Sequence, residues 1–299
     1  MIRNKKLGLS VLMGLMLGTG LAACTDTEER PHTTATTTVS PPAVQALTVV
    51  SPPERIEKMR AERGELEQAA PVVRILSPAN NSVIEGSTVQ VRVSLSGDLK
   101  GYKPGKDPVT GEGDHLHVIL DNKPYEACYD LSEPFEFTNV APGRHTLRIF
   151  ASRSFHESYK NEGAFHMVVF TVKGSETTTA SPAQDEKAAP GAPDPARPLL
   201  TYSRPKGEYK GDEADPIMID FWLTNARLKE DGGEFRVRYI IDDGEPGYID
   251  RWAPLWLSGW TNGKHAVRLE LLGPDQNPVE NGGLNTTTRE ITVIRNSSP

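Results

Sequence analysis

One stretch of this sequence occurs twice, at residues 134–149 and again at 254–269, and the two copies align without a gap. A Pro, a Gly, a His and an Arg coincide in the two copies, and so do the apolar positions. Shorter matches extend the likeness on both sides, pairing 116–121 with 237–242 and 170–172 with 291–293. Self-similarity at a fixed spacing indicates a repeated structural unit. The sequence therefore predicts a duplicated domain.

Both copies carry the periodicity of β-strands. Apolar and polar residues alternate at 89–95 and at 235–239, as expected for strands with one buried face. Turn-forming clusters separate the short apolar runs at Asn80-Asn81, Pro142-Gly143, Asp231-Gly232-Gly233 and Asn262-Gly263. The predicted fold class is all-β, with one sandwich at 71–173 and a second at 199–295.

Two segments outside the sandwiches are poor in large apolar residues. Residues 25–53 contain eight Thr and five Pro, and 174–198 contain five Pro and six Ala. Such segments cannot bury enough apolar surface to offset the entropy of ordering them. We predict a disordered stalk at 24–53 and a disordered linker at 174–198.

A short helix is predicted between the stalk and the first sandwich, at residues 54–70. Ile56, Met59 and Leu66 give this segment a thin apolar stripe. Ser51 is the expected N-cap, with Pro52 at the first helical position.

Residues 1–23 are predicted to be a signal peptide that is removed. Arg3, Lys5 and Lys6 precede an uncharged apolar stretch, which ends in the tetrapeptide Leu-Ala-Ala-Cys at Cys24. This tetrapeptide resembles the lipobox of bacterial lipoproteins, which implies that Cys24 is lipidated. By the same resemblance, Thr25 rather than Asp after the cysteine implies the outer membrane. The predicted location is the bacterial cell envelope, with a lipid anchor in the membrane. An ordinary secretory signal is the alternative.

The sandwiches also carry marks of a known class. Ser77-Pro78, Asn80-Asn81 and Glu85-Gly86 precede alternating strands in the first copy. With the lipobox, these marks resemble bacterial lipoproteins that have tandem immunoglobulin-like or fibronectin-like β-sandwich domains of uncharacterised function. Residues 113–117, followed by an apolar run and Asp121, resemble a signature of uncharacterised bacterial exported domains. These resemblances imply a fold and a location, and a fold does not fix a function.

The repeat assigns roles to several polar residues. His145 and His265 occupy the same place on the apolar face of one strand, so a structural role is predicted for both. Arg148 and Arg268 fall on the opposite face and are expected to be solvated.

His115 and His117 have no such counterparts, because Arg236 and Arg238 take their places in the second copy. Histidines at positions i and i+2 of a strand point the same way and can chelate a transition metal when further ligands converge. The further candidate ligands are Asp114, His156 and His166. The alternative is a solvated strand face.

Cys128 and two tryptophans are the remaining candidates. Cys128 has no partner if Cys24 is lipidated, and a half-buried free thiol is expected. Trp252 and Trp256 are predicted to form an exposed aromatic patch that contacts a protein or a sugar. Packing against the other sandwich or the loops is the alternative.

No motif for a catalytic centre or a phosphate-binding loop occurs in the sequence, so neither an enzyme nor a cofactor is predicted. The formal net charge of -7 argues against a nucleic-acid partner. The predicted function is non-enzymatic binding of a protein or a polysaccharide of the cell envelope. The alternative is periplasmic copper or zinc binding through the first domain.

Overall fold

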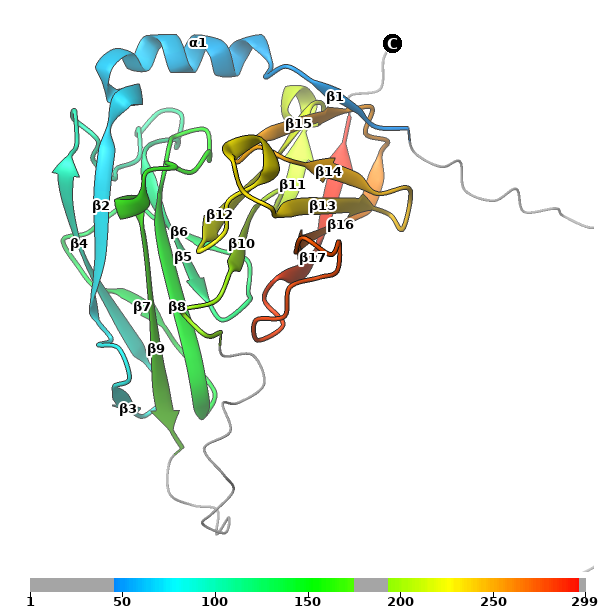
Figure 1. Cartoon of the computed structure of the whole chain (residues 1–299). Helices are drawn as coiled ribbons and strands as arrows, with labels where there is room; N and C mark the ends of the chain where they lie inside the picture. Colours follow the sequence, from blue (N-terminus) through cyan, green and yellow to red (C-terminus); the bar gives the residue numbers. More distant parts are fainter. Residues whose placement is uncertain (1–45, 175–192, 296–299) are drawn as a thin grey trace, which may run out of the picture. The chain divides into compact units, whose positions relative to one another are not determined.

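The alternating segments form two β-sandwiches with the same strand order, in a computed structural model that describes residues 46–174 and 193–295 (Figure 1). The strands of the first sandwich are β2 (Ala70–Ser77), β3 (Val83–Glu85), β4 (Val89–Asp98), β5 (His115–Leu120), β6 (Glu126–Cys128), β7 (Phe135–Phe137), β8 (Gly143–Ser152) and β9 (Phe165–Lys173). Those of the second are β10 (Leu199–Arg204), β11 (Gly207–Lys210), β12 (Ile217–Thr224), β13 (Arg236–Ile241), β14 (Gly247–Ile249), β15 (Leu255–Ser258), β16 (Gly263–Leu272) and β17 (Thr286–Ile294).

The sheet order identifies the fold class. In the first sandwich a sheet ordered β2-β4-β7 faces one ordered β3-β9-β8-β5-β6. The second sandwich repeats this arrangement with β10-β12-β15 and β11-β17-β16-β13-β14. Lettered in chain order, these sheets place strands A, B and E opposite C, F and G, which is the immunoglobulin arrangement. The predicted all-β fold with two tandem immunoglobulin-like sandwiches is confirmed.

Each sandwich has its own apolar core, filled from alternate positions of its strands. Leu147 and Ile149 of β8 are fully buried in the first core, and Val267 and Leu269 of β16 are fully buried in the second. Because side chains alternate across a strand, the intervening residues point out of each core.

The two histidines that recur in the repeat form the same local structure twice. His145 contacts the carboxylate of Asp121 at 2.9 Å and the carbonyl oxygen of Ala141 at 2.8 Å. His265 contacts Asp242 at 2.6 Å and the carbonyl oxygen of Thr261 at 2.9 Å. Asp121 and Asp242 both have positive φ, at 56° and 51°, a conformation that Asp tolerates better than most residues. Each histidine joins the end of one strand to the neighbouring turn, as the predicted structural role requires.

Part of the predicted stalk belongs to the second sandwich. Strand β1 (Thr48–Val50) pairs antiparallel with β15, at the sheet position next to strand E. The free edge of β15 leaves backbone N–H and C=O groups that this segment satisfies. The predicted boundary at residue 53 is therefore wrong, whereas residues 24–45 lie outside the described part of the chain.

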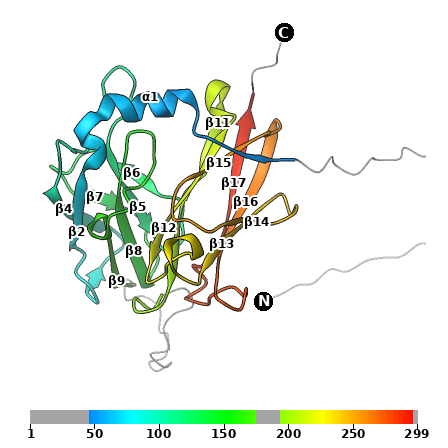
Figure 2. The same cartoon turned by 45° about the horizontal axis from the view of Figure 1, so that its top comes forward.

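The predicted helix is present, but it begins differently from the prediction. Helix α1 spans Glu54–Arg63 and continues into the 3₁₀ turn η1 (Gly64–Gln68). Its N-cap is Pro53 rather than Ser51, because the carbonyl oxygen of Pro53 accepts the first helical hydrogen bonds. The helix runs from β1 to the first sandwich in both views (Figures 1 and 2). Ile56 is buried beneath it, together with Phe155 of the first sandwich and Met218 and Trp256 of the second.

The predicted linker is also ordered at its C-terminal end. Asn281 accepts a hydrogen bond from the backbone N–H of Asp194 at 2.7 Å, and Asn285 donates to the carbonyl oxygen of Pro198 at 2.9 Å. Residues 193–198 therefore belong to the second sandwich, and 175–192 lie outside the described residues. Three further 3₁₀ turns are η2 (Glu162–Ala164), η3 (Gly211–Glu213) and η4 (Lys229–Asp231).

The two sandwiches pack against each other through the outer faces of their sheets. Every residue of β5 is buried, and so is every residue of β12 except the last, although a strand on one core should bury only alternate residues. Trp222 of β12 stacks on Phe165 of β9 at 5.5 Å and belongs to the core of the first sandwich. Because the outer face of one sandwich packs on the outer face of the other, both faces of β5 and β12 are shielded from solvent.

Because of this packing, the prediction that Arg148 is solvated is wrong. Arg148 is 1% exposed, donating to the hydroxyl of Thr201 at 3.0 Å and to the carbonyl oxygen of Asp121. Its counterpart Arg268 keeps a side chain that is 38% exposed, so only the second copy fits the prediction. The repeat correctly places both arginines away from the core, but the first copy is covered by the other sandwich.

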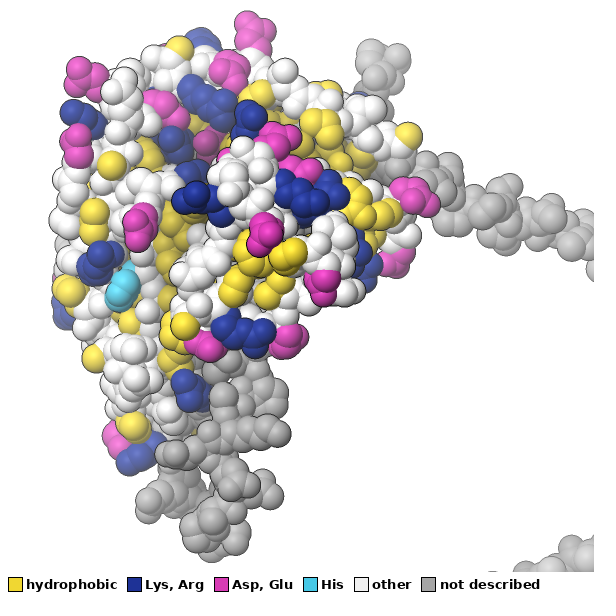
Figure 3. Space-filling model, in the orientation of Figure 1, with side chains coloured by type: hydrophobic (Ala, Val, Ile, Leu, Met, Phe, Trp, Pro, Cys, Tyr) yellow, Lys and Arg dark blue, Asp and Glu magenta, His cyan; other side chains and the backbone are white. Residues whose placement is uncertain are grey.

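The remaining surface is mixed in charge. On the face shown in Figure 3, basic and acidic side chains are interspersed, and neither sign forms a continuous patch. No helix within 46–174 or 193–295 has the length and apolar character needed to cross a membrane.

Candidate metal centre

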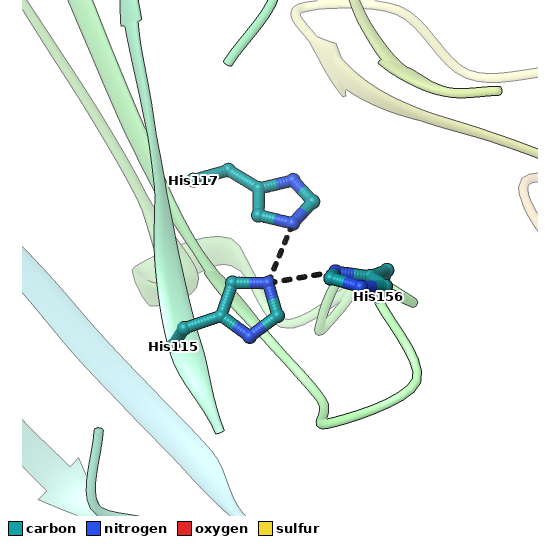
Figure 4. A group of neighbouring side chains, drawn as sticks. All are labelled: His115, His117 and His156. Atoms are coloured by element: carbon teal, nitrogen blue, oxygen red, sulfur yellow. Dashed lines mark hydrogen bonds between the residues drawn. The ribbon is translucent and has the colours of Figure 1, made fainter. Parts of the chain in front are cut away.

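Three histidine side chains converge on one point beside the second sandwich (Figure 4). His115 and His117 lie on β5 and point out of the first core, as their alternation predicts. His156 lies in the turn after β8, where its φ of 68° directs the ring back toward the strand. A left-handed φ is unusual outside glycine but is several-fold enriched in Asn, Asp and His. We call His115, His117 and His156 the histidine trio.

The ring nitrogens of the trio are in contact distance. The Nε2 atom of His115 lies 3.0 Å from Nε2 of His117 and 3.0 Å from Nδ1 of His156. Each histidine places a potential ligand atom within 4.8 Å of the others. Zinc–nitrogen bonds of about 2.0–2.1 Å in tetrahedral geometry separate two ligand nitrogens by about 3.3 Å. Two of the three separations in the trio are within a few tenths of an ångström of this value, and the third is below 4.8 Å, so side-chain adjustment would bring the trio onto one metal ion.

The Nδ1 atoms of His115 and His117, which face away from the other rings of the trio, already have hydrogen-bond partners. The Nδ1 atom of His115 lies 2.8 Å from the carbonyl oxygen of Gly113, which can only accept, so Nδ1 carries the hydrogen and Nε2 keeps a lone pair. The Nδ1 atom of His117 lies 3.2 Å from the hydroxyl of Ser203 on β10. Partners of this kind fix the orientation and tautomer of metal-ligating histidines. One lone pair on His115 cannot accept a full hydrogen bond from both neighbouring rings, whereas a metal ion would satisfy all three.

Burial keeps these rings neutral. His115 and His117 are fully buried. The pKa of His115 is lowered to about 4, mainly by burial, and burial also lowers the pKa of His117 well below its usual value. The pKa of His156 is lowered by burial and by the positive charge of Arg204. Neutral imidazole is the form that binds a metal ion.

Aromatic rings and a small cavity surround the trio. The ring of Tyr125 stacks on His117 at 3.5 Å, with its hydroxyl 3.4 Å from Nδ1 of His156. A cavity of about 90 Å³ borders His156 and is also lined by Met59, Met218 and Arg204. A set of three histidines leaves a fourth coordination position for another ligand, as in catalytic zinc sites.

Two predicted ligands do not reach the trio. His166 lies on β9, where its Nδ1 accepts a hydrogen bond from the backbone N–H of Ile75 at 3.1 Å. Asp114 forms an ion pair with Arg63 of α1 at 2.7 Å, so its carboxylate contacts the helix and not the trio. The alternative of a solvated strand face is wrong for β5, because β10 covers it.

The two tryptophans do not form the single exposed patch that the sequence predicted. Trp256 is only 4% exposed and packs against Ile56, Phe155 and Met218. Trp252 is half-buried, with its ring edge-on to Trp222 at 5.0 Å and its indole N–H donating to the carbonyl oxygen of Phe221. The alternative, packing, describes Trp256, whereas Trp252 is packed on one side and lines a surface cleft.

Cys128 is more buried than predicted. Its side chain belongs to the first core, and its Sγ contacts the carbonyl oxygen of Asp130 at 3.2 Å. Within the described residues it is a free cysteine, and burial raises its pKa. A raised pKa disfavours the reactive thiolate.

Sequence reasoning missed three residues around the trio: Tyr125, Ser203 and Arg204. Ser203 and Arg204 come from the second sandwich, so no spacing within the first copy could indicate them. Tyr125 lies in the turn that joins β5 to β6, and its closeness in sequence to the histidines was the available signal.

No known protein family and no curated protein matches this sequence. Several solved structures resemble it weakly. The fibronectin(III)-like modules of CbhA from Clostridium thermocellum are 14% identical, with 75% of this chain and 95% of that chain covered and a TM-score of 0.25. The central fibronectin-III array of RIM-binding protein is 10% identical, with 77% and 71% covered and a TM-score of 0.24. The PKD domain of human KIAA0319 is 15% identical, with 38% and 89% covered and a TM-score of 0.21. These scores are too low to support any argument, so the fold class rests on the strand order described above.

Proposed function

We propose that this protein binds a transition-metal ion, copper or zinc, through His115, His117 and His156. The observation that carries the proposal is the convergence of three neutral ring nitrogens in a buried site, two of them 3.0 Å from the same Nε2 atom. Imidazole nitrogens suit copper and zinc, and magnesium and calcium prefer oxygen ligands. No Asp, Glu or Cys of the described chain joins this group.

Binding rather than catalysis fits the burial of the site. His115 and His117 are fully buried, with Ser203 of β10 against His117, so a substrate has little access to a metal ion held by these two side chains. The same covering would make metal exchange slow. We therefore propose a non-enzymatic role in holding a metal ion.

The proposed setting is the bacterial cell envelope, with Cys24 lipidated and the protein anchored in the outer membrane. This part of the proposal rests on the N-terminal sequence, which lies outside the described residues. Several acyl chains on one cysteine would hold the protein firmly to a membrane. Metabolic labelling with a palmitate analogue tests it: label should enter the wild-type protein and be lost in Cys24→Ala. An unlabelled wild-type protein in the soluble fraction would contradict the anchor.

Metal binding is tested by calorimetric titration of the purified protein with Zn(II), Cu(II) and Cu(I). We expect one ion to bind per chain, with His117→Asn weakening its affinity about 100-fold or more. His156→Asn is a second variant, because Asn tolerates the positive φ of this turn while removing the ligand.

His166→Asn is the matched control. It removes a histidine of the same sandwich that lies outside the trio, so the metal affinity should not change. Equal losses in His117→Asn and His166→Asn would show that binding is not located at the trio. Absence of binding for all three ions would refute the proposed function.

A cleft on the described surface supports a second candidate function, the binding of a polysaccharide of the cell envelope. The cleft has a volume of about 700 Å³ and is lined by Trp252, Phe165 and Phe235 together with polar side chains such as Asn225. Clefts of this size with aromatic walls and a few polar groups are typical of ligand sites. Trp252→Phe should weaken retention on an immobilised envelope polysaccharide, and unchanged retention would contradict this candidate.

A further inference from the structure

Two cationic side chains of the second sandwich lie beside the histidine trio without a close ion pair among the described residues. Arg204 ends β10, and Lys206 follows it. Neither forms an ion pair with any residue of the described chain, although Glu213 acts on Arg204 and Glu126 on Lys206 from a greater distance. Lys206 donates only to the carbonyl oxygen of Tyr125 and lies over the ring of that tyrosine at 4.1 Å. Partly buried charges are normally paired, because leaving water is costly for them.

The guanidinium of Arg204 has an unused donor. Its Nη1 donates to the hydroxyl of Tyr209 at 3.1 Å, but its Nε is buried and has no partner among the described residues. The guanidinium also lies 5.5 Å from the centre of the Tyr125 ring, which stacks on His117. Its positive charge lowers the pKa of each histidine of the trio. A divalent ion at the trio would therefore add its charge to an already positive site.

One cavity borders both the trio and Arg204. His156 and Arg204 both line the cavity of about 90 Å³. A water molecule occupies about 30 Å³ of liquid, so this space suits a small oxyanion of about four heavy atoms. Three carboxylates, Glu112, Glu208 and Glu213, also line the cavity, but all three are exposed, so that solvent weakens their field, and Glu213 pairs with Arg55 at 3.9 Å.

We propose that the site binds a small carboxylate or carbonate anion together with a divalent metal ion. One oxygen of the anion occupies the fourth coordination position of the metal, and the guanidinium of Arg204 binds the anion from the other side. Arginine presents its donors in a planar fork that matches such an anion. The anion neutralises part of the charge that the metal and the two cationic side chains bring together. This inference rests on the proposed metal binding.

The test is a titration of the folded protein with Co(II), which reports its ligands by visible absorption. Wild-type protein is titrated in buffer with sodium chloride and then in buffers of equal ionic strength with acetate or with bicarbonate. We expect at least one of the two anions to raise the Co(II) affinity about tenfold or more and to change the absorption spectrum. The arm with the larger effect identifies the anion as a carboxylate or as carbonate.

Arg204→Met and Arg144→Met separate the role of the cavity from general charge. Arg144 is exposed, so its variant should keep the full anion effect. The Co(II) affinity of Arg204→Met in chloride is the reference for the anion effect of that variant. Its anion effect should fall below about twofold.

An anion effect in Arg204→Met as large as in wild type would overturn the proposal. So would a wild-type protein that binds Co(II) or Cu(I) tightly with no response to either anion, and this result is decisive even if Arg204→Met does not fold. In both cases the proposed metal binding survives. Absence of any metal binding by wild-type protein refutes the proposed function itself.

Discussion

Replacing Asp220 by Ala tests the packing of the two sandwiches. Asp220 lies on β12 of the second sandwich and is fully buried, and the hydrogen-bond partners of its carboxylate lie in the first. Its carboxylate accepts from the hydroxyl of Ser158 at 2.8 Å, from the backbone N–H of Ser158 at 3.2 Å, and from Lys160 Nζ at 2.7 Å. The variant removes all three bonds at once.

The expected loss follows from what remains after the substitution. Breaking a buried ion pair by deleting one partner costs about 3–5 kcal/mol, because the other charge stays buried. Lys160 keeps the carbonyl oxygen of Phe221 at 2.7 Å, and its side chain is 21% exposed. These two facts place the expected loss in the lower half of that range, at about 3–4 kcal/mol of unfolding free energy.

Urea denaturation followed by circular dichroism and by tryptophan fluorescence measures this loss. Glu290→Ala is the control, because the pair of Lys264 and Glu290 has a similar length of 2.8 Å but both side chains are more than half exposed. We expect no measurable change for Glu290→Ala. A loss for Asp220→Ala as small as that for the control would show that the carboxylate is solvated. The packing of the two sandwiches derived from these contacts would then be wrong.

Three further variants or conditions test other parts of the structure. Trp256→Ala should lower the unfolding free energy by about 3–5 kcal/mol in thermal or urea melts, because the indole is buried; a change below about 1 kcal/mol would fit an exposed tryptophan instead. Asp242→Ala should cost about 2–3 kcal/mol by the same melts, since His265 and the backbone N–H of Ala266 both lose an acceptor, and Asp121→Ala should behave alike in the first copy. Burial raises the pKa of Cys128, so the folded state holds its proton to higher pH than the unfolded state does; unfolding free energy should therefore fall as pH rises through the ordinary thiol value, and the part of this decline that precedes tyrosine ionisation should vanish in Cys128→Ala.

The sequence by itself determined the features that depend on local periodicity. Alternation of apolar residues fixed which side of each strand faces its own core, and the gapless repeat required two copies of one sandwich. The repeat also separated His145 and His265, which recur and are structural, from His115 and His117, which do not recur. These inferences hold because side-chain direction along a strand follows from the chain alone.

Only the tertiary structure decided what lies against the outer faces. Arg148 and Arg268 have the same position in the repeat, yet the first is buried and the second is partly exposed. The second sandwich covers the sheet that holds Arg148, whereas Arg268 lies in the sheet of the second sandwich that faces away from the first. The same covering buries His115 and His117 and supplies Ser203 and Arg204 to the site. Ile56 of helix α1 and Phe155 of the first sandwich pack on Trp256, which lies outside the core of its own sandwich. Contacts between segments far apart in the sequence depend on how completed sheets pack, and no pattern within a single strand records that choice.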